Sequence, residues 1–129
     1  MLKFIFIRKN VNTGSTTILV NESSENMIVL DHEANYEINK EDLEKIRPYL
    51  EEADFILLEG ELSKEITNQI INASFLLNKK CIFNPAPAYL LDEEMLSKVN
   101  YLIPNEKSFF FALDVIVKTK PLIIFYLKG

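Results

Sequence analysis

Near the start of the chain, apolar residues alternate with polar ones at the spacing of β-strands. Extended runs occur at Leu2–Arg8, Thr16–Val20 and Met27–Asp31, and the turn-rich segment Asn21–Asn26 separates the last two. A period of two with β-branched residues is typical of strands that have a solvated face. The pattern therefore predicts a small antiparallel meander of three strands.

Further along the chain, apolar runs alternate with segments of helical spacing. The runs that predict strands are Phe55–Leu58, Cys81–Phe83, Tyr101–Ile103 and Leu122–Tyr126. Asn39, Ser63, Asp92 and Asn105 stand where side chains cap the first turn of a helix. The order β-α-β-α-β-α-β predicts an α/β fold, with a mostly parallel sheet, flanking helices and right-handed crossovers.

Three details of these elements are open to test. Pro48 either kinks the helix that begins after Asn39 or starts a second short helix. The helix after Ser63 runs to about Asn78, with Ile66, Ile70, Ile71 and Phe75 as its core face. The continuous apolar run Phe55–Leu58 predicts a strand covered on both faces.

This topology predicts where a ligand would bind. In open parallel sheets, ligands bind beyond the carboxyl ends of the strands. The residues that follow the predicted strands are Glu59 and Glu61, Asn84–Ala88, Pro104–Glu106 and Lys128–Gly129. We expect these groups to line one edge of the sheet although they are far apart in the sequence.

Composition excludes several classes of protein. The 129 residues suit a single domain, and no apolar run is long enough to cross a bilayer. Arg8 and Lys9 interrupt the short apolar start, which argues against a signal peptide. The net charge is −5, and the 14 basic residues are scattered among 19 acidic ones, which argues against a nucleic-acid partner. We expect a cytoplasmic protein.

The reactive residue types are scarce. Cys81 lies in a strand-like run and is interpreted as a small buried hydrophobe rather than a nucleophile. His32 lies in a polar segment and is interpreted as solvated. With one cysteine and one histidine, neither an internal disulfide nor a zinc site is expected.

Several short motifs together resemble one family, the ribokinase/phosphofructokinase-B superfamily of carbohydrate kinases. Asn84–Ala88 resembles its N-P-A-P-A turn, and Pro104–Glu106 resembles its P-N-E. Glu61 stands where the family has an acidic residue that touches the sugar. The segment Thr13-Gly14 followed by Ile18–Val20 resembles the family's lid strand, T-G-x-A-x-I-x-V. Two later elements of the lid are matched by Glu25-Asn26 and Ala34-Asn35. The blocks occur in the family order over about residues 12 to 106.

The resemblance implies a ribokinase-like fold with a β-sheet lid at residues 1–36 and a partial α/β core at residues 37–129. It implies ATP-dependent phosphorylation of a ribose-type sugar, with Mg²⁺ as the metal. Sugar-binding residues would be Glu61, Thr16 and Ile18, and phosphate-binding residues Asn84 and Asn105. Glu106 would lie near the metal. The lid strands, residues 2–31, would join two copies in a homodimer.

The sequence also departs from the family pattern. No G-A-G-D occurs in these 129 residues, so no catalytic base is assigned, and the chain resembles only the middle of the family. Ser108 stands where the second acid of N-x-x-E belongs. Thr16 and Glu33 replace an alanine and a glycine of the lid. We therefore expect negligible kinase activity from this polypeptide alone.

Each candidate residue also has an ordinary structural explanation. Glu61 suits a solvated loop, Asn84 suits any turn before a proline, and Asn105 caps a helix without a ligand. The negative charge of Glu106 in a first helical turn interacts favourably with the helix dipole, and this requires no metal. Two other interpretations stay open: a non-catalytic binding or oligomerisation module, and one half of a split kinase.

Overall fold

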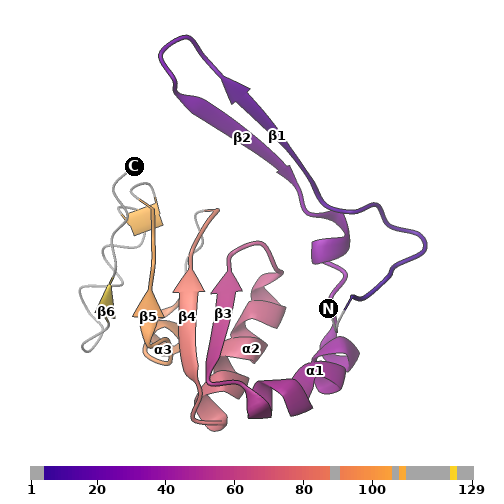
Figure 1. The fold of residues 1–129 in the computed structure, drawn as a ribbon, viewed down its shortest axis with the longest axis vertical. Coiled ribbons are helices and arrows are strands. Elements are labelled where there is room, and N and C mark those ends of the chain that lie inside the picture. The colour runs from indigo at the N-terminus through magenta and orange to yellow at the C-terminus, as the bar shows by residue number, and fades with distance from the viewer. Residues whose placement is uncertain (1–4, 88–90, 106–107, 110–122, 125–129) are drawn as a thin grey trace.

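A parallel sheet with helices on one side forms the body of the molecule (Figure 1). The computed structural model describes residues 5–87, 91–105, 108–109 and 123–124. The sheet contains β3 (Phe55–Glu59), β4 (Lys80–Asn84), β5 (Tyr101–Leu102) and β6 (Ile123–Ile124), adjacent in that order. All three strand pairs are parallel. The predicted α/β class is confirmed.

The helices begin where the sequence predicted them. In the described part of the chain they are α1 (Lys40–Glu52), α2 (Lys64–Leu76) and α3 (Glu93–Leu96), and a 3₁₀ turn spans Glu33–Asn35. The side chains of Ser63 and Asp92 accept backbone hydrogen bonds from Ile66 and Met95, at 3.4 and 2.9 Å. These bonds satisfy N–H groups that have no partner within the helix.

Helix α1 begins with a reciprocal capping box. Asn39 Oδ1 accepts from the backbone N–H of Asp42 at 3.1 Å, and Asp42 Oδ2 accepts from the backbone N–H of Asn39 at 3.2 Å. The helix continues through Pro48 to Glu52. The interpretation that Pro48 starts a second helix is therefore wrong, and the proline is held inside one continuous helix.

A two-stranded hairpin projects away from the sheet (Figure 1). Its strands β1 (Ser15–Val20) and β2 (Asn26–Asp31) are antiparallel, with Ile18 opposite Ile28. Asn21 builds the turn, because its Oδ1 accepts from the backbone N–H groups of Ser23 and Glu25, at 3.0 and 2.9 Å. The last two strands of the predicted meander are thus confirmed.

The first predicted strand, Leu2–Arg8, is not formed where the structure describes it. Residues 5–8 belong to no strand, and residues 2–4 lie outside the described residues. Arg8 instead forms an ion pair with the carboxylate of Asp42 and donates to the Glu37 carbonyl at 3.2 Å. Asp42 is 1% exposed, so its charge needs a partner, and the pairing draws this segment onto α1.

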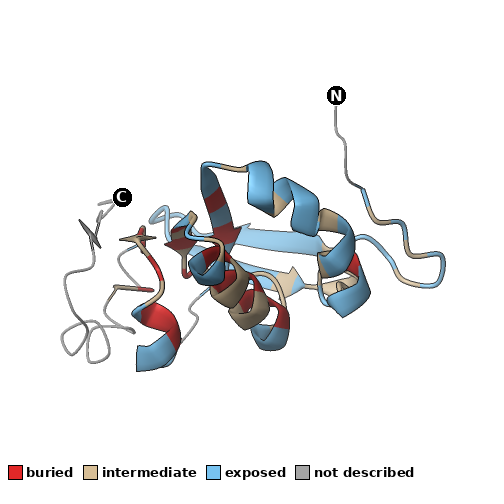
Figure 2. Cartoon of the chain, turned by 90° about the horizontal axis from the view of Figure 1, so that it is seen from below, coloured by how far each residue is buried: buried red, intermediate tan, exposed pale blue. Residues whose placement is uncertain are grey.

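The core lies on one face of the sheet. Ile56 and Leu58 of β3, and Cys81 and Phe83 of β4, pack with Ile71 of α2. Met95 and Leu96 of α3 belong to the same cluster, so both helices cover the same face. The buried residues gather where strands and helices meet (Figure 2). Burial of this apolar surface is the main stabilising term of the fold.

Two predictions about burial are wrong. The opposite face of β3 is open, since Phe55 and Leu57 are 58% and 68% exposed, so this strand is not covered on both faces. Phe75 is 58% exposed and does not join the core face of α2. Its ring lies 6.0 Å from the ammonium of Lys98. Side chains alternate between the faces of a strand, and the described helices cover one face only.

Replacing Leu58 and Leu57 by alanine in turn tests which face is the core. Leu58→Ala removes a buried side chain and should lower the free energy of unfolding by about 3 kcal/mol. Leu57→Ala, the matched control on the open face, should lower it by less than about 1 kcal/mol. Urea unfolding measures both. Equal losses, or a larger loss for Leu57→Ala, would contradict the assignment.

The Arg8–Asp42 ion pair is tested by Arg8→Gln. This change removes the guanidinium from the buried Asp42 carboxylate and leaves it the more distant Lys45 ammonium, 3.6 Å from its Oδ1. We expect a loss of about 2 kcal/mol in the free energy of unfolding. Lys9→Gln removes the neighbouring exposed charge and should change stability by less than about 0.5 kcal/mol. Similar thermal and urea midpoints for the two variants would show that the pair does not hold the segment.

Candidate functional site

The carboxyl ends of the parallel strands meet at one edge of the sheet. The arrows of β3, β4 and β5 point to the same edge in Figure 1. Glu59, the last residue of β3, lies opposite Asn84, the last residue of β4. Glu61 follows β3 by two residues, and Asn105 follows β5 by three. The structure therefore brings the loops that carry Glu61, Asn84 and Asn105 to neighbouring strand ends, as predicted.

Backbone contacts fix these loops. The N–H of Gly60 donates to the carbonyls of Asn84 and Ala86, both at 3.1 Å, and so joins the end of β3 to the turn after β4. The N–H of Ile103 donates to the Phe83 carbonyl at 2.9 Å. Pro85 and Pro104 are fully buried. The polar residues of this edge thus stand on a rigid backbone, which suits a binding site.

Asn105 acts as a helix cap. Its Oδ1 accepts from the backbone N–H of Ser108 at 2.8 Å, and its carbonyl accepts from the N–H of Phe109 at 2.8 Å. Because Oδ1 is engaged, the amide NH₂ is the group that remains for a ligand. Ser108 is 3% exposed, and Glu106 lies outside the described residues.

The two predicted lid residues lie apart from this edge. Thr16 and Ile18 are both on β1, two positions apart, so their side chains share one face of the hairpin. Both are exposed, Ile18 to 57%. The hairpin stands clear of the strand ends in Figure 1. The structure therefore presents Thr16 and Ile18 together but does not bring them to Glu61.

A shallow hollow lies between the base of the hairpin and the start of α2, and the sequence did not point to it. Its volume is about 420 Å³, which is within the range of small-ligand pockets. Tyr36 and Ile38 line it from the hairpin side, and Ser63 and Ile66 from α2, which begins just after Glu61. Lys40 and Glu65, an ion pair at 3.5 Å, also line the hollow.

His32 and Tyr36 form a stack beside this hollow. Their ring centroids lie 4.1 Å apart and the ring planes differ by 11°. His32 is half-buried, so its interpretation as a solvated residue is only partly right. The i, i+4 spacing of the two rings was the signal available in the sequence. The stack supports the backbone where the hairpin joins α1.

The described residues do not by themselves form a metal centre. No group of three or more His, Cys, Asp or Glu side chains in the described ranges is placed to hold a metal ion. At the strand ends, Glu59 and Glu61 are the carboxylates that the structure describes. The predicted metal residue, Glu106, lies outside these ranges.

Cys81 is fully buried, as its sequence context predicted. Desolvation by burial raises the pKa of its thiol to about 11, and a hydrogen bond with Ser74 opposes this shift. A raised pKa means that the thiol stays protonated at neutral pH, so Cys81 is not a nucleophile.

Among the described helices, none is long and apolar enough to cross a membrane.

Comparisons with known proteins agree with this geometry. Residues 2–114 match the model of the pfkB family carbohydrate kinases. A ribokinase of Haemophilus influenzae is 33% identical over 97 residues, which cover 73% of this chain and 31% of that protein. Mouse ribokinase is 30% identical over 105 residues, 81% of this chain and 32% of that protein. This chain thus spans about a third of the length of these relatives.

Solved structures show the same fold. The crystal structure of ribokinase from Thermotoga maritima matches with a TM-score of 0.70 and 30% sequence identity, covering 93% of this chain and 44% of that one. The ribokinase-like fold, with its parallel sheet and small antiparallel pair, is confirmed. The family model covers most of the chain, and the strand-end loops carry the expected motifs. The chain therefore belongs to the pfkB family of carbohydrate kinases.

Proposed function

We propose that this chain forms the lid and the middle strands of an ATP-dependent sugar kinase. The proposed reaction transfers the γ-phosphoryl group of ATP to a hydroxyl of a ribose-type sugar. The observation that carries the proposal is the alignment of the Glu61, Asn84 and Asn105 loops at one sheet edge. The curated relatives named ribokinase support the choice of sugar.

In this proposal residues 1–36 are the lid and residues 37–129 are part of the core. The Glu61 carboxylate accepts hydrogen bonds from sugar hydroxyls, since an ionised carboxylate is an acceptor only. Thr16 and Ile18, on one face of β1, cover the bound sugar when the hairpin closes. Closure excludes water, so that the phosphoryl group is not lost to hydrolysis.

Asn84 and Asn105 are proposed to bind phosphate. The NH₂ of Asn105 supplies two N–H donors to anionic oxygens, and its position is fixed by the cap to Ser108. A relative that is 25% identical, ribokinase of Cryptococcus neoformans, was solved in complex with ADP, which supports a nucleotide as the phosphate ligand. Glu106 is proposed as a magnesium ligand, but the described carboxylates do not form such a site, and no catalytic step is assigned to it.

The polypeptide of residues 1–129 is expected to bind sugar without phosphorylating it, because it has no G-A-G-D aspartate to accept the proton of the sugar hydroxyl. A coupled ADP-release assay with ribose should give background rates. Turnover well above background would contradict this part of the proposal.

Ribose binding is tested by melting temperature and calorimetric titration. A ligand at ten times its Kd stabilises the folded state by about 1.4 kcal/mol, which raises Tm by several degrees in a domain of this size. Glu61→Gln should abolish the shift with ribose. Glu93→Gln, an exposed change on α3, should keep it. Mg-ATP is titrated separately, and no response to either ligand would count against a binding site in this polypeptide.

We further propose that two copies associate through the hairpin strands within residues 2–31. The exposed apolar residues on its two faces support this: Ile18 and Ile28 on one, and Leu19, Met27 and Val29 on the other. Apolar patches of this kind mark association sites. The same surface would serve a non-catalytic oligomerisation module.

Association through the hairpin is tested by size-exclusion chromatography with light scattering. Ile28→Lys and Met27→Lys place a charge on one face or the other. The variant that lowers the molecular mass identifies the face in contact, because a desolvated lysine opposes association. Lys9→Gln is the control. A clean monomer for the unmodified chain at micromolar concentration would contradict the proposal.

A further inference from the structure

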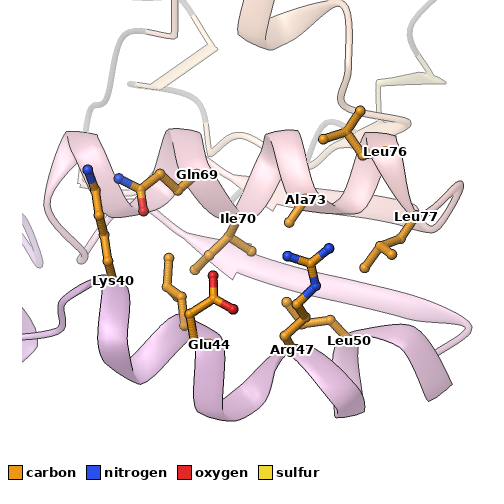
Figure 3. A pocket seen from close by; sticks show the side chains of 10 residues that line it. Lys40, Glu44, Arg47, Leu50, Gln69, Ile70, Ala73, Leu76 and Leu77 are labelled. Atoms are coloured by element: carbon orange, nitrogen blue, oxygen red, sulfur yellow. The ribbon is translucent and has the colours of Figure 1, made fainter.

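A second surface, away from the sheet edge and the hairpin, lies between α1 and α2. A groove of about 240 Å³ separates the two helices. Leu76, the last residue of α2, and Leu77, its C-cap, form part of the apolar wall. Lys40, Glu44 and Arg47 reach over the groove from α1 (Figure 3). Leu76 is 81% exposed. An apolar wall left this open beside charged residues is typical of a protein contact surface.

The charged residues of α1 form one stripe along the helix. Lys40, Glu44, Arg47 and Glu51 are spaced by four, three and four residues, which keeps them on the same side of an α-helix. Their signs alternate from positive to negative. All four are exposed, with side-chain exposures of 72% for Lys40, 59% for Arg47 and 51% for Glu51.

The order of charges along α1 is complementary to the same order read in the opposite direction along a second α1. If a second α1 lies antiparallel to the first, with the two-fold axis between residues 45 and 46, Lys40 meets Glu51 and Glu44 meets Arg47. Each pair occurs twice, so four attractive pairs form and no like charges meet. A two-fold interface requires this self-complementarity, because the same patch contributes both sides.

We propose that the groove and the charged stripe form an interface with a second copy of this chain, through antiparallel pairing of α1 helices. The apolar wall supplies buried surface and the charges set the orientation. An ordinary solvent-exposed helix would also explain the alternating charges, since Arg47 and Glu51 pair within α1 at 3.4 Å. It does not account for the exposed Leu76 beside the stripe. A stripe with two charges of each sign favours neither an acidic nor a basic partner.

The test uses charge reversal and mixing, followed by light scattering and sedimentation equilibrium. Glu44→Arg or Arg47→Glu alone sets two pairs of like charges against each other, and each should raise the Kd of self-association by about tenfold or more. An equimolar mixture of these two variants restores all four attractive pairs between unlike copies and should associate as the unmodified chain does. The double variant Glu44→Arg/Arg47→Glu should also recover association.

Glu52→Arg changes charge by the same amount one residue outside the stripe and should leave the Kd unchanged. The series is repeated in the Ile28→Lys/Met27→Lys background, which separates this interface from the hairpin contact. Recovery in the mixture cannot come from misfolding, and circular dichroism checks each variant. The proposal would be overturned if neither reversal weakened association, or if association recovered in neither the mixture nor the double variant. It would also be overturned if the Ile28→Lys/Met27→Lys chain without any change in α1 did not associate.

Discussion

The packing of α2 and α3 against one face of the parallel sheet is the constraint on which the other features depend. Ile71, Cys81 and Phe83 have no exposure, and protein interiors are packed too closely to let such residues slide past one another. The strands are thereby held in register, with Leu58 beside Phe83 and Phe83 beside Leu102. Because the register is fixed, β3, β4 and β5 present their carboxyl ends at one edge, and the polar loops become neighbours there.

The hairpin is held by a different kind of interaction. Its strands bury little of their surface. The segments that flank it are held by the Arg8–Asp42 ion pair, by the His32–Tyr36 stack and by the contact of Ile38 with the core, next to the Asn39–Asp42 capping box. A single carboxylate, Asp42, thus caps α1 and receives the segment that leads into the hairpin. Elements that bury few apolar side chains move at low cost. An element that closes over a ligand needs this property.

The site and the two proposed contact surfaces occupy different parts of the molecule. The strand-end loops suit small polar ligands, since they combine a fixed backbone with carboxylate and amide groups. The hairpin offers apolar strands, and the α1–α2 groove offers an apolar wall bordered by charges of both signs. Two distinct two-fold contacts on one chain build assemblies larger than a dimer, so each contact has to be measured with the other one removed.

The sequence by itself determined the features that depend on neighbours a few residues away, together with the family. The caps at Asn39, Ser63, Asp92 and Asn105 join groups three residues apart. The strand-end motifs could be recognised because they are short, contiguous sequences that occur in the family order. The tertiary structure decided which face of β3 is buried, because Leu57 and Leu58 are chemically alike and only the position of α2 distinguishes them. It also decided that Arg8 pairs with Asp42, that Phe75 is exposed, and that a hollow adjoins Tyr36. Each of these depends on contacts between residues far apart in the chain. A local pattern of polar and apolar positions does not determine which distant surface packs against it.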